Sequence, residues 1–161
     1  MNPTDYDQAL ICANGHVATS MLRRAPAHFA PFCEQCGQPN LSECPGCSAP
    51  IRGYYFGGAI GGHYFRPAYC IQCGAAFPWQ QQAMEAAREL ADEIEELSPE
   101  ERTRLKRSLE EISTDSPRTE LAAGRIKKVV ERLGGPTGQL LQKVAETVAT
   151  EAAKAAMRGG L

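Results

Sequence analysis

The sequence predicts an α+β fold in which short β-hairpins precede a helical region. All seven cysteines, all three histidines and all aromatic residues lie within residues 1–79. Residues 80–161 contain none of these residue types, and their apolar side chains recur at the three- and four-residue spacing of amphipathic helices. We therefore expect two domains, 1–79 and 80–161, with the boundary at the change of composition near Trp79.

Composition and charge narrow the classes of function. The chain has 161 residues and a net charge of −2, so no overall positive field attracts nucleic acid. It has no apolar run long enough to cross a bilayer. Residues 1–17 are acidic and lack the basic region and apolar core of a secretory signal. These features predict a cytoplasmic protein, and in that reducing compartment clustered cysteines bind metal more often than they form disulfides.

The cysteines form three C-x-x-C pairs and one C-x-x-x-H pair. A C-x-x-C turn directs two sulfur atoms to one point about 2.3 Å from a zinc ion. Asn14-Gly15 is a turn dipeptide that can fold His16 back beside Cys12, which adds an eighth ligand to seven thiols. We predict two structural zinc ions, each closed by four protein ligands. The candidate metal ligands are Cys12, His16, Cys33, Cys36, Cys44, Cys47, Cys70 and Cys73.

The identity of the eighth ligand and of the metal has alternatives. His63, in the stretch GGHYF, competes with His16. Mixed thiolate and imidazole ligands favour zinc, whereas iron in an all-cysteine site is the alternative. A thioredoxin-like redox function is disfavoured because no βαβ pattern surrounds any pair.

The four ligand pairs can share two metals in three ways. Consecutive pairing joins the first pair with the second and the third with the fourth. Nesting joins the second with the third, and cross-bracing joins alternate pairs. We favour consecutive pairing, which makes each site a zinc ribbon with residues 48–69 as a β-hairpin.

Five stretches in the first half occur in a characteristic order: CANGH, FCEQCG, CPGC, APIRG and YCIQCGAAFPW. In this order they resemble a family of small bacterial double zinc-ribbon proteins with a helical C-terminal tail and no assigned activity. The resemblance covers residues 8–79 well and the tail loosely. It implies metal binding at the eight residues named above, and it implies no reaction.

Four helices are expected in residues 80–161 from their start and stop signals. Ser98, Pro99 and Glu101 form the pattern of a capping box with proline at the first helical position. Ser116-Pro117 repeats the cap and the proline, and the Gly-Gly-Pro stretch 134–136 separates the last two helices. The predicted helices span 79–97, 99–113, 117–133 and 137–157.

Charge is unevenly distributed along this helical region. Residues 85–101 carry eight acidic side chains and one arginine, whereas residues 102–132 carry nine basic and five acidic side chains. We expect these segments to pair with each other rather than to form a nucleic-acid surface.

The aromatic segment 52–69 is a candidate interaction surface. It interleaves tyrosine and phenylalanine with Arg52 and Arg66, and such side chains can stack on single-stranded nucleic acid. Only four basic residues occur in residues 1–79, however, which makes a poor surface for phosphates. Packing of the aromatic rings around the metal sites is the simpler interpretation.

The last predicted helix carries a wide face of small apolar residues. Such a face suits packing in a core or against a second copy of the chain. A membrane interface is less favoured, because bulky anchors and a basic polar face are missing. The face consists of Leu141, Val144, Ala145, Val148, Ala152 and Ala156.

The motifs of catalysis are missing: there is no nucleophile elbow, phosphate loop or metalloprotease helix. We therefore predict a structural zinc-binding protein, not an enzyme, that presents an interaction surface to a protein partner or to a second copy. Nucleic-acid binding through residues 52–69 is the alternative. A membrane-interface effector acting through the C-terminal helix is the second alternative.

Overall fold

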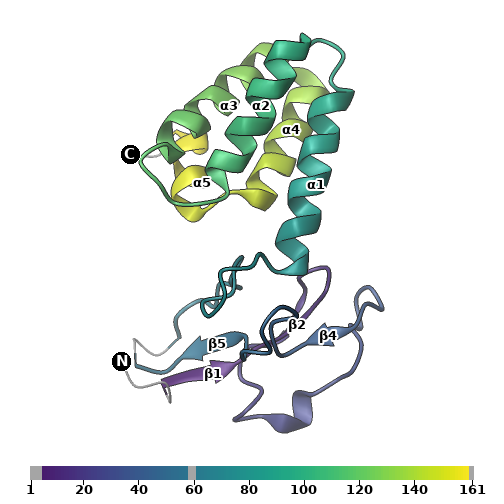
Figure 1. The fold of residues 1–161 in the computed structure, drawn as a ribbon, viewed down its shortest axis with the longest axis vertical. Coiled ribbons are helices and arrows are strands. Elements are labelled where there is room, and N and C mark those ends of the chain that lie inside the picture. The colour runs from purple at the N-terminus through teal and green to yellow at the C-terminus, as the bar shows by residue number, and fades with distance from the viewer. Residues whose placement is uncertain (1–4, 58–60, 160–161) are drawn as a thin grey trace. The chain divides into compact units, whose positions relative to one another are not determined.

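The computed structural model describes residues 5–57 and 61–159 (Figure 1). The chain divides into two compact units, Met1–Gln81 and Gln82–Leu161, and the division falls within helix α1 (Pro78–Glu93). Short antiparallel strands occupy the first unit, and helices make up the second. The predicted α+β fold class is confirmed.

Two small antiparallel sheets organise the first unit. One pairs β1 with β5, and the other has the strand order β3-β2-β4. The elements are β1 (Tyr6–Gln8), β2 (Leu10–Cys12), β3 (Val17–Thr19), the 3-10 helix η2 (Pro26–His28), β4 (Asn40–Leu41) and β5 (Arg52–Tyr55).

Strand β5 does not form the hairpin that the sequence predicted within residues 48–69. It pairs with β1 instead, and the described residues 61–69 contain no strand; residues 58–60 lie outside the described residues. Gly53 explains this pairing, because a Cβ at this position would overlap the carbonyl oxygen of Ser20 and the backbone of Gln8. The Tyr54 N–H donates to the same Ser20 oxygen at 2.8 Å. A glycine therefore lets β5 lie close against the N-terminal segment.

The apolar core of the first unit is small. Ala9, Ile11 and Ile51 are buried together with the rings of Phe77 and Trp79, whose centroids lie 4.7 Å apart. Trp79 Nε1 donates a hydrogen bond to the carbonyl of Pro67 at 2.9 Å, so its buried polar atom is satisfied. The other buried members of this cluster are the cysteines Cys44 and Cys70.

Helix α1 ends at Glu93, four residues before the predicted end at 97. The other helices begin and end close to the predicted positions, with two exceptions. The capping box at the start of α2 is present: the Glu101 N–H donates to Ser98 Oγ and the Ser98 N–H donates to Glu101 Oε2. Helix α3 begins two residues later than predicted, because Ser116 and Pro117 form a turn. The helices are α1 (Pro78–Glu93), α2 (Pro99–Ile112), α3 (Thr119–Leu133), α4 (Gly135–Val148) and α5 (Glu151–Arg158).

The second exception is the predicted helix 137–157, which is two helices. Ala149 is extended, and the Thr150 side chain caps α5 by accepting from the Ala153 N–H at 3.2 Å. The Thr150 N–H donates to the carbonyl of Ile112 at the end of α2, which fixes the break. The break changes the buried face, so that Ala153 is buried and the predicted Ala152 is exposed.

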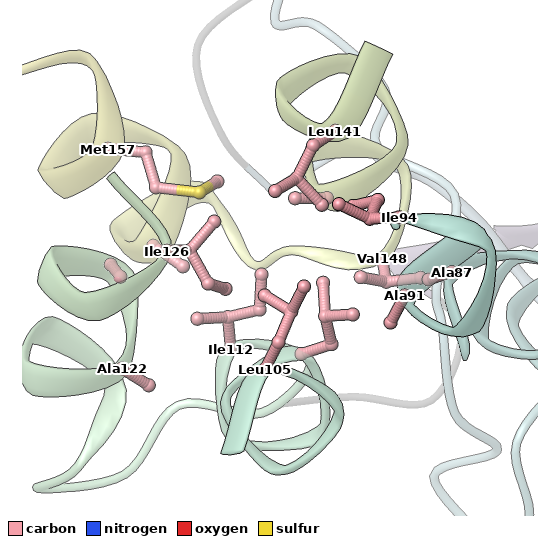
Figure 2. Close-up of a cluster of buried hydrophobic side chains, with 14 of the residues drawn as sticks. Ala87, Ala91, Ile94, Leu105, Ile112, Ala122, Ile126, Leu141, Val148 and Met157 are labelled. Carbon is pink, nitrogen blue, oxygen red and sulfur yellow. The ribbon is translucent and has the colours of Figure 1, made fainter. Parts of the chain in front are cut away.

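The core of the helical unit draws on all five helices (Figure 2). Leu105 and Ile112 of α2, Ile126 of α3 and Leu141 of α4 point toward one another, and each is at least 97% buried. Met157 of α5 closes the cluster. None of the described helices combines the length and the apolar character needed to span a bilayer.

The break between α4 and α5 leads to a test with two adjacent alanines. Ala153→Glu should lower the free energy of unfolding by about 3 kcal/mol or more, because it places a carboxylate in the core. Ala152→Glu should change it by less than about 0.5 kcal/mol, because this side chain is exposed. Urea unfolding followed by far-ultraviolet circular dichroism measures both. A greater loss in Ala152→Glu would indicate one continuous helix over 137–157.

Candidate metal centres

The three C-x-x-C segments share one backbone turn. In each, the residue four positions after the first cysteine donates its N–H to the carbonyl of that cysteine at 2.8 Å. The first cysteine in turn donates its N–H to the carbonyl of the residue five positions after it, also at 2.8 Å. A short β-bridge flanks each turn. The donors in the first set of hydrogen bonds are Gly37, Ser48 and Gly74.

This donor position requires a left-handed backbone. Gly37 and Gly74 have φ of 73° and 74°, which glycine adopts without strain. Ser48 has φ of 61° and is the one non-glycine residue with positive φ in the described part of the chain. A side chain in this conformation costs about 1–2 kcal/mol, so the third turn is held in a conformation that its own sequence disfavours.

The Cys12–His16 segment folds back as predicted from Asn14-Gly15. The Gly15 N–H donates to the Cys12 carbonyl at 2.8 Å, and the Cys12 N–H donates to the His16 carbonyl at 3.0 Å. Gly15 has φ of 89°, and a Cβ there would overlap the guanidinium of Arg66. The His16 N–H also donates to Cys12 Sγ at 3.2 Å, which stabilises a thiolate.

The first group of ligand atoms fits a tetrahedral zinc ion. Its four atoms, from Cys12, His16, Cys33 and Cys36, lie within 4.8 Å of one another. Cys12 Sγ is 3.7 Å from Cys36 Sγ, and His16 Nδ1 is 3.5 Å from Cys12 Sγ and 3.6 Å from Cys33 Sγ. Tetrahedral zinc with ordinary bond lengths requires sulfur–sulfur distances of about 3.8 Å and nitrogen–sulfur distances of about 3.5 Å.

The second group contains four cysteines with the same spacing. Cys44 Sγ lies 3.8 Å from Cys73 Sγ, and Cys47 Sγ lies 3.7 Å from Cys70 Sγ. A disulfide would require about 2.05 Å, so these sulfur atoms are placed as ligands rather than as bonded pairs. Of the three arrangements left open by the sequence, the structure has consecutive pairing.

His63 does not belong to either group. Its ring packs edge-on against Phe65, with the centroids 5.0 Å apart. The structure therefore brings His16, and not His63, to the three thiols of the first group.

The thiols of the second group differ in proton affinity. The pKa of Cys70 is lowered to about 7, because the backbone N–H groups of Cys73 and Gln72 donate to its sulfur. The Ala49 N–H lowers the pKa of Cys47, but burial and the neighbouring thiols raise it to about 12. Four thiols this close do not all ionise by themselves, and a divalent cation at their centre would supply the missing positive charge.

Arg66 belongs to the segment that the nucleic-acid alternative required as a surface, but it lies against the turn of the first ligand group. Its guanidinium donates to the carbonyl of Gly15. Burial lowers the pKa of Arg66, while the charge of Cys12 acts in the opposite direction. Arg66 therefore contacts the backbone between two ligands of the first group and places a positive charge near its thiolates.

The other polar groups of residues 52–69 are also engaged within the unit. Tyr64 Oη donates to the carbonyl of Arg52 at 2.6 Å, and the Arg52 guanidinium lies over the Tyr6 ring at 4.4 Å. The rings of Tyr54 and Phe56 pack edge-to-face with centroids 5.0 Å apart. These side chains contact one another within the unit, whereas Phe65 is 64% exposed, so packing of the rings around the metal sites stays a prediction.

Residues 5–157 match a family described as an uncharacterised protein conserved in bacteria (DUF2321). The chain belongs to this family. The predicted resemblance to an uncharacterised bacterial family is thereby confirmed, and the match extends through the helical half of the chain. Comparison with curated proteins and with solved structures found no match.

The turn that the three C-x-x-C segments have in common allows a paired test of backbone strain. Ser48→Gly should raise the free energy of unfolding by about 1 kcal/mol, because glycine removes the penalty of positive φ. Gly74→Ala should lower it by a similar amount, and purely through the backbone, because a Cβ there meets no atom within 4 Å.

Thermal unfolding of the metal-loaded protein measures the stability of both variants. Gly37→Ala should lower the free energy of unfolding in the same way as Gly74→Ala and serves as a second example. Destabilisation by Ser48→Gly would show that the serine side chain has a role that outweighs its strain.

Proposed function

We propose that both groups bind zinc as a structural ion and that the unit so organised presents a binding surface to a protein partner. The observation that carries the first part is the agreement of five ligand–ligand distances with tetrahedral zinc. A three-thiolate, one-imidazole set and a four-thiolate set are both typical of structural zinc, and iron is the alternative for the second.

We propose no catalytic role for either ion. In each group, four protein ligands would fill the four positions around a tetrahedral ion, so no position is left for an activated water or a substrate. Seven thiolates around two divalent ions leave a formal charge of −3, which Arg66 offsets in part at the first group.

The binding surface that we propose lies beside the first group. Val17, Phe29 and Phe32 are 40%, 59% and 60% exposed, an unusual density of large apolar side chains on a small unit. A cavity of about 340 Å³ is lined by Val17 and Phe32 and also by His16 and Asn40. Asn40 Oδ1 is buried and has no hydrogen-bond partner among the residues that the structure describes, so it is an available acceptor.

A protein segment suits this surface better than nucleic acid does. The lining of the cavity includes Glu34 and no lysine or arginine, so it offers nothing to a phosphate backbone. Val17 and Ala18 of the lining belong to β3, an outer strand of the three-stranded sheet, where an extended peptide can add as a further strand. We expect the partner to insert an apolar side chain and to donate a hydrogen bond to Asn40.

Self-assembly through the C-terminal helix is not part of this proposal. Leu141, Ala145 and Val148, the centre of the predicted small-residue face, are at least 98% buried within the helical unit itself. These three side chains are consequently not available to a second copy or to a membrane interface, whereas Val144 and Ala156 are half-buried and Ala152 is exposed.

Metal content tests the first part of the proposal. The purified, reduced protein should contain two zinc ions per chain by elemental analysis. His16→Ala should lower the content toward one ion, because it removes a ligand from the first group. His63→Ala is the matched control and should retain two ions. Iron in place of zinc, or loss of metal in His63→Ala alone, would contradict the assignment.

Site-directed photo-cross-linking tests the second part. A photoreactive amino acid in place of Phe32 should cross-link one protein in native cells. The same substitution at Phe65, which is 64% exposed, is the matched control and should not yield this product.

The identified protein should then bind the purified chain directly. Phe32→Ser should weaken that binding at least about tenfold, as expected for an aromatic side chain that becomes buried in the complex. Phe65→Ser should leave the affinity unchanged. Cross-links to nucleic acid, to lipid or only to a second copy would contradict a separate protein partner.

A further inference from the structure

Helices α2 and α3 enclose a cavity of about 330 Å³ between them. The two helices run antiparallel, because Arg132 near the end of α3 pairs with Glu101 at the start of α2, and Arg118 pairs with Glu111 at the other end. Leu105, Ile126 and Val129 give the cavity an apolar surface. Its volume is at the lower end of the range for small-molecule sites.

The rim of this cavity is strongly basic. Its charged lining residues are Arg104, Arg125, Lys128, Arg132 and Glu101. Both oxygens of the Glu101 carboxylate are already used, since Oε1 accepts from Arg132 at 2.6 Å and Oε2 accepts from the Ser98 N–H at 2.9 Å. The lining therefore carries a formal charge of +3 and no carboxylate oxygen without a hydrogen bond, although Arg125 also pairs with Glu111, outside the lining, at 3.7 Å.

Outside the cavity, two basic residues of α2 have acidic partners, and the first of these pairs joins the acidic segment to the basic segment as the sequence predicted. Lys106 pairs with Asp92 at 2.5 Å, and Arg107 pairs with Glu111 at 3.3 Å. Among the described residues, by contrast, no carboxylate lies within ion-pair distance of Arg104 or Lys128. Both are exposed and line the cavity, Arg104 from α2 and Lys128 from α3, and the charge of Arg104 also helps to lower the pKa of Glu101.

The wall of the cavity also contains an unused hydroxyl group. Ser108 is 1% exposed, and its Oγ has no hydrogen-bond partner in the described part of the chain. A serine within a helix ordinarily donates to the carbonyl four residues earlier. A buried hydroxyl without a partner is unfavourable, so its presence here is better suited to a bound ligand than to stability.

We propose that this cavity binds a small organic phosphate, a phosphate monoester with a compact apolar group. Arg104 and Lys128 bind the phosphate, because a guanidinium donates to two of its oxygens at once and an ammonium adds charge. The apolar group lies against Leu105, Ile126 and Val129. This site is separate from the metal centres and does not depend on the proposed protein partner.

An extended nucleic acid fits these features less well. A polyanion needs a continuous basic track, whereas the cations here line one half-open cavity. The charged side chains of residues 85–101, a segment that runs into the start of α2, are acidic except for Arg88.

Phenyl phosphate is a suitable probe, because it combines a phosphate monoester with a small ring. Added to the 161-residue, metal-loaded chain, it should produce saturable amide shifts in α2 and α3 by nuclear magnetic resonance. Arg104→Gln combined with Lys128→Gln should weaken this binding at least about tenfold. Arg107→Gln combined with Lys127→Gln removes the same charge from the same helices outside the cavity, and should change the affinity less than about twofold.

Four results would overturn the proposal. One is the absence of saturable shifts at millimolar phenyl phosphate. The second is an equal loss of affinity in the control variant, which would indicate general charge attraction. The third is tighter binding of a single-stranded oligonucleotide that displaces the probe and weakens steeply with salt, which would make the cavity part of a nucleic-acid surface. Phenol and inorganic phosphate should each bind more weakly than phenyl phosphate, and equal binding of inorganic phosphate would also contradict a site for an organic ester.

Discussion

The convergence of four ligand atoms on one point, which occurs twice in the first unit, is the constraint on which that unit depends. Its strands are two to four residues long, and among its described residues the buried apolar side chains, apart from cysteine, are those of Ala9, Leu10, Ile11, Ile51, Phe77 and Trp79. Such a core is too small to hold long connecting segments in place. Each ligand group joins two turns that lie far apart in the chain, and structural zinc contributes about 10 kcal/mol or more to folding in small domains.

The two ligand groups are coupled through the sheet rather than independent. Strand β4 (Asn40–Leu41) lies between the second and third ligand pairs in sequence, and Asn40 is the register partner of Cys12. Leu41 packs against the cluster that contains Cys44 and Cys70. A two-residue strand cannot be stable alone, so its position depends on the ligand pairs on either side. Disorder at either group is therefore transmitted to the other through β4.

What the sequence predicted was local, and what it missed depended on contacts between distant segments. The turns at Asn14-Gly15 and at the C-x-x-C pairs follow from residue type and spacing, so the ligand residues could be named from the sequence. Which ligand pairs come together depends on β2 lying between β3 and β4, and that is a contact between distant segments. The hairpin at 48–69 was wrong because Gly53 meets the backbone near Ser20, which no local pattern reveals. The break before α5 did have a signal, Thr150, but the alanine-rich surroundings favour a continuous helix.

The metal-binding turns also explain how this unit keeps large apolar side chains in water. Val17 directly follows the ligand His16, Phe32 directly precedes Cys33, and Ile71, which is 66% exposed, directly follows Cys70. In an ordinary small domain such side chains would turn inward, because burial is what fixes the backbone. Here hydrogen bonds and ligand geometry fix the backbone of each turn, so the adjacent apolar residues are free to remain on the surface. A rigid turn that carries an exposed aromatic side chain loses little conformational entropy on binding, and this favours recognition of a partner over a role in stability alone.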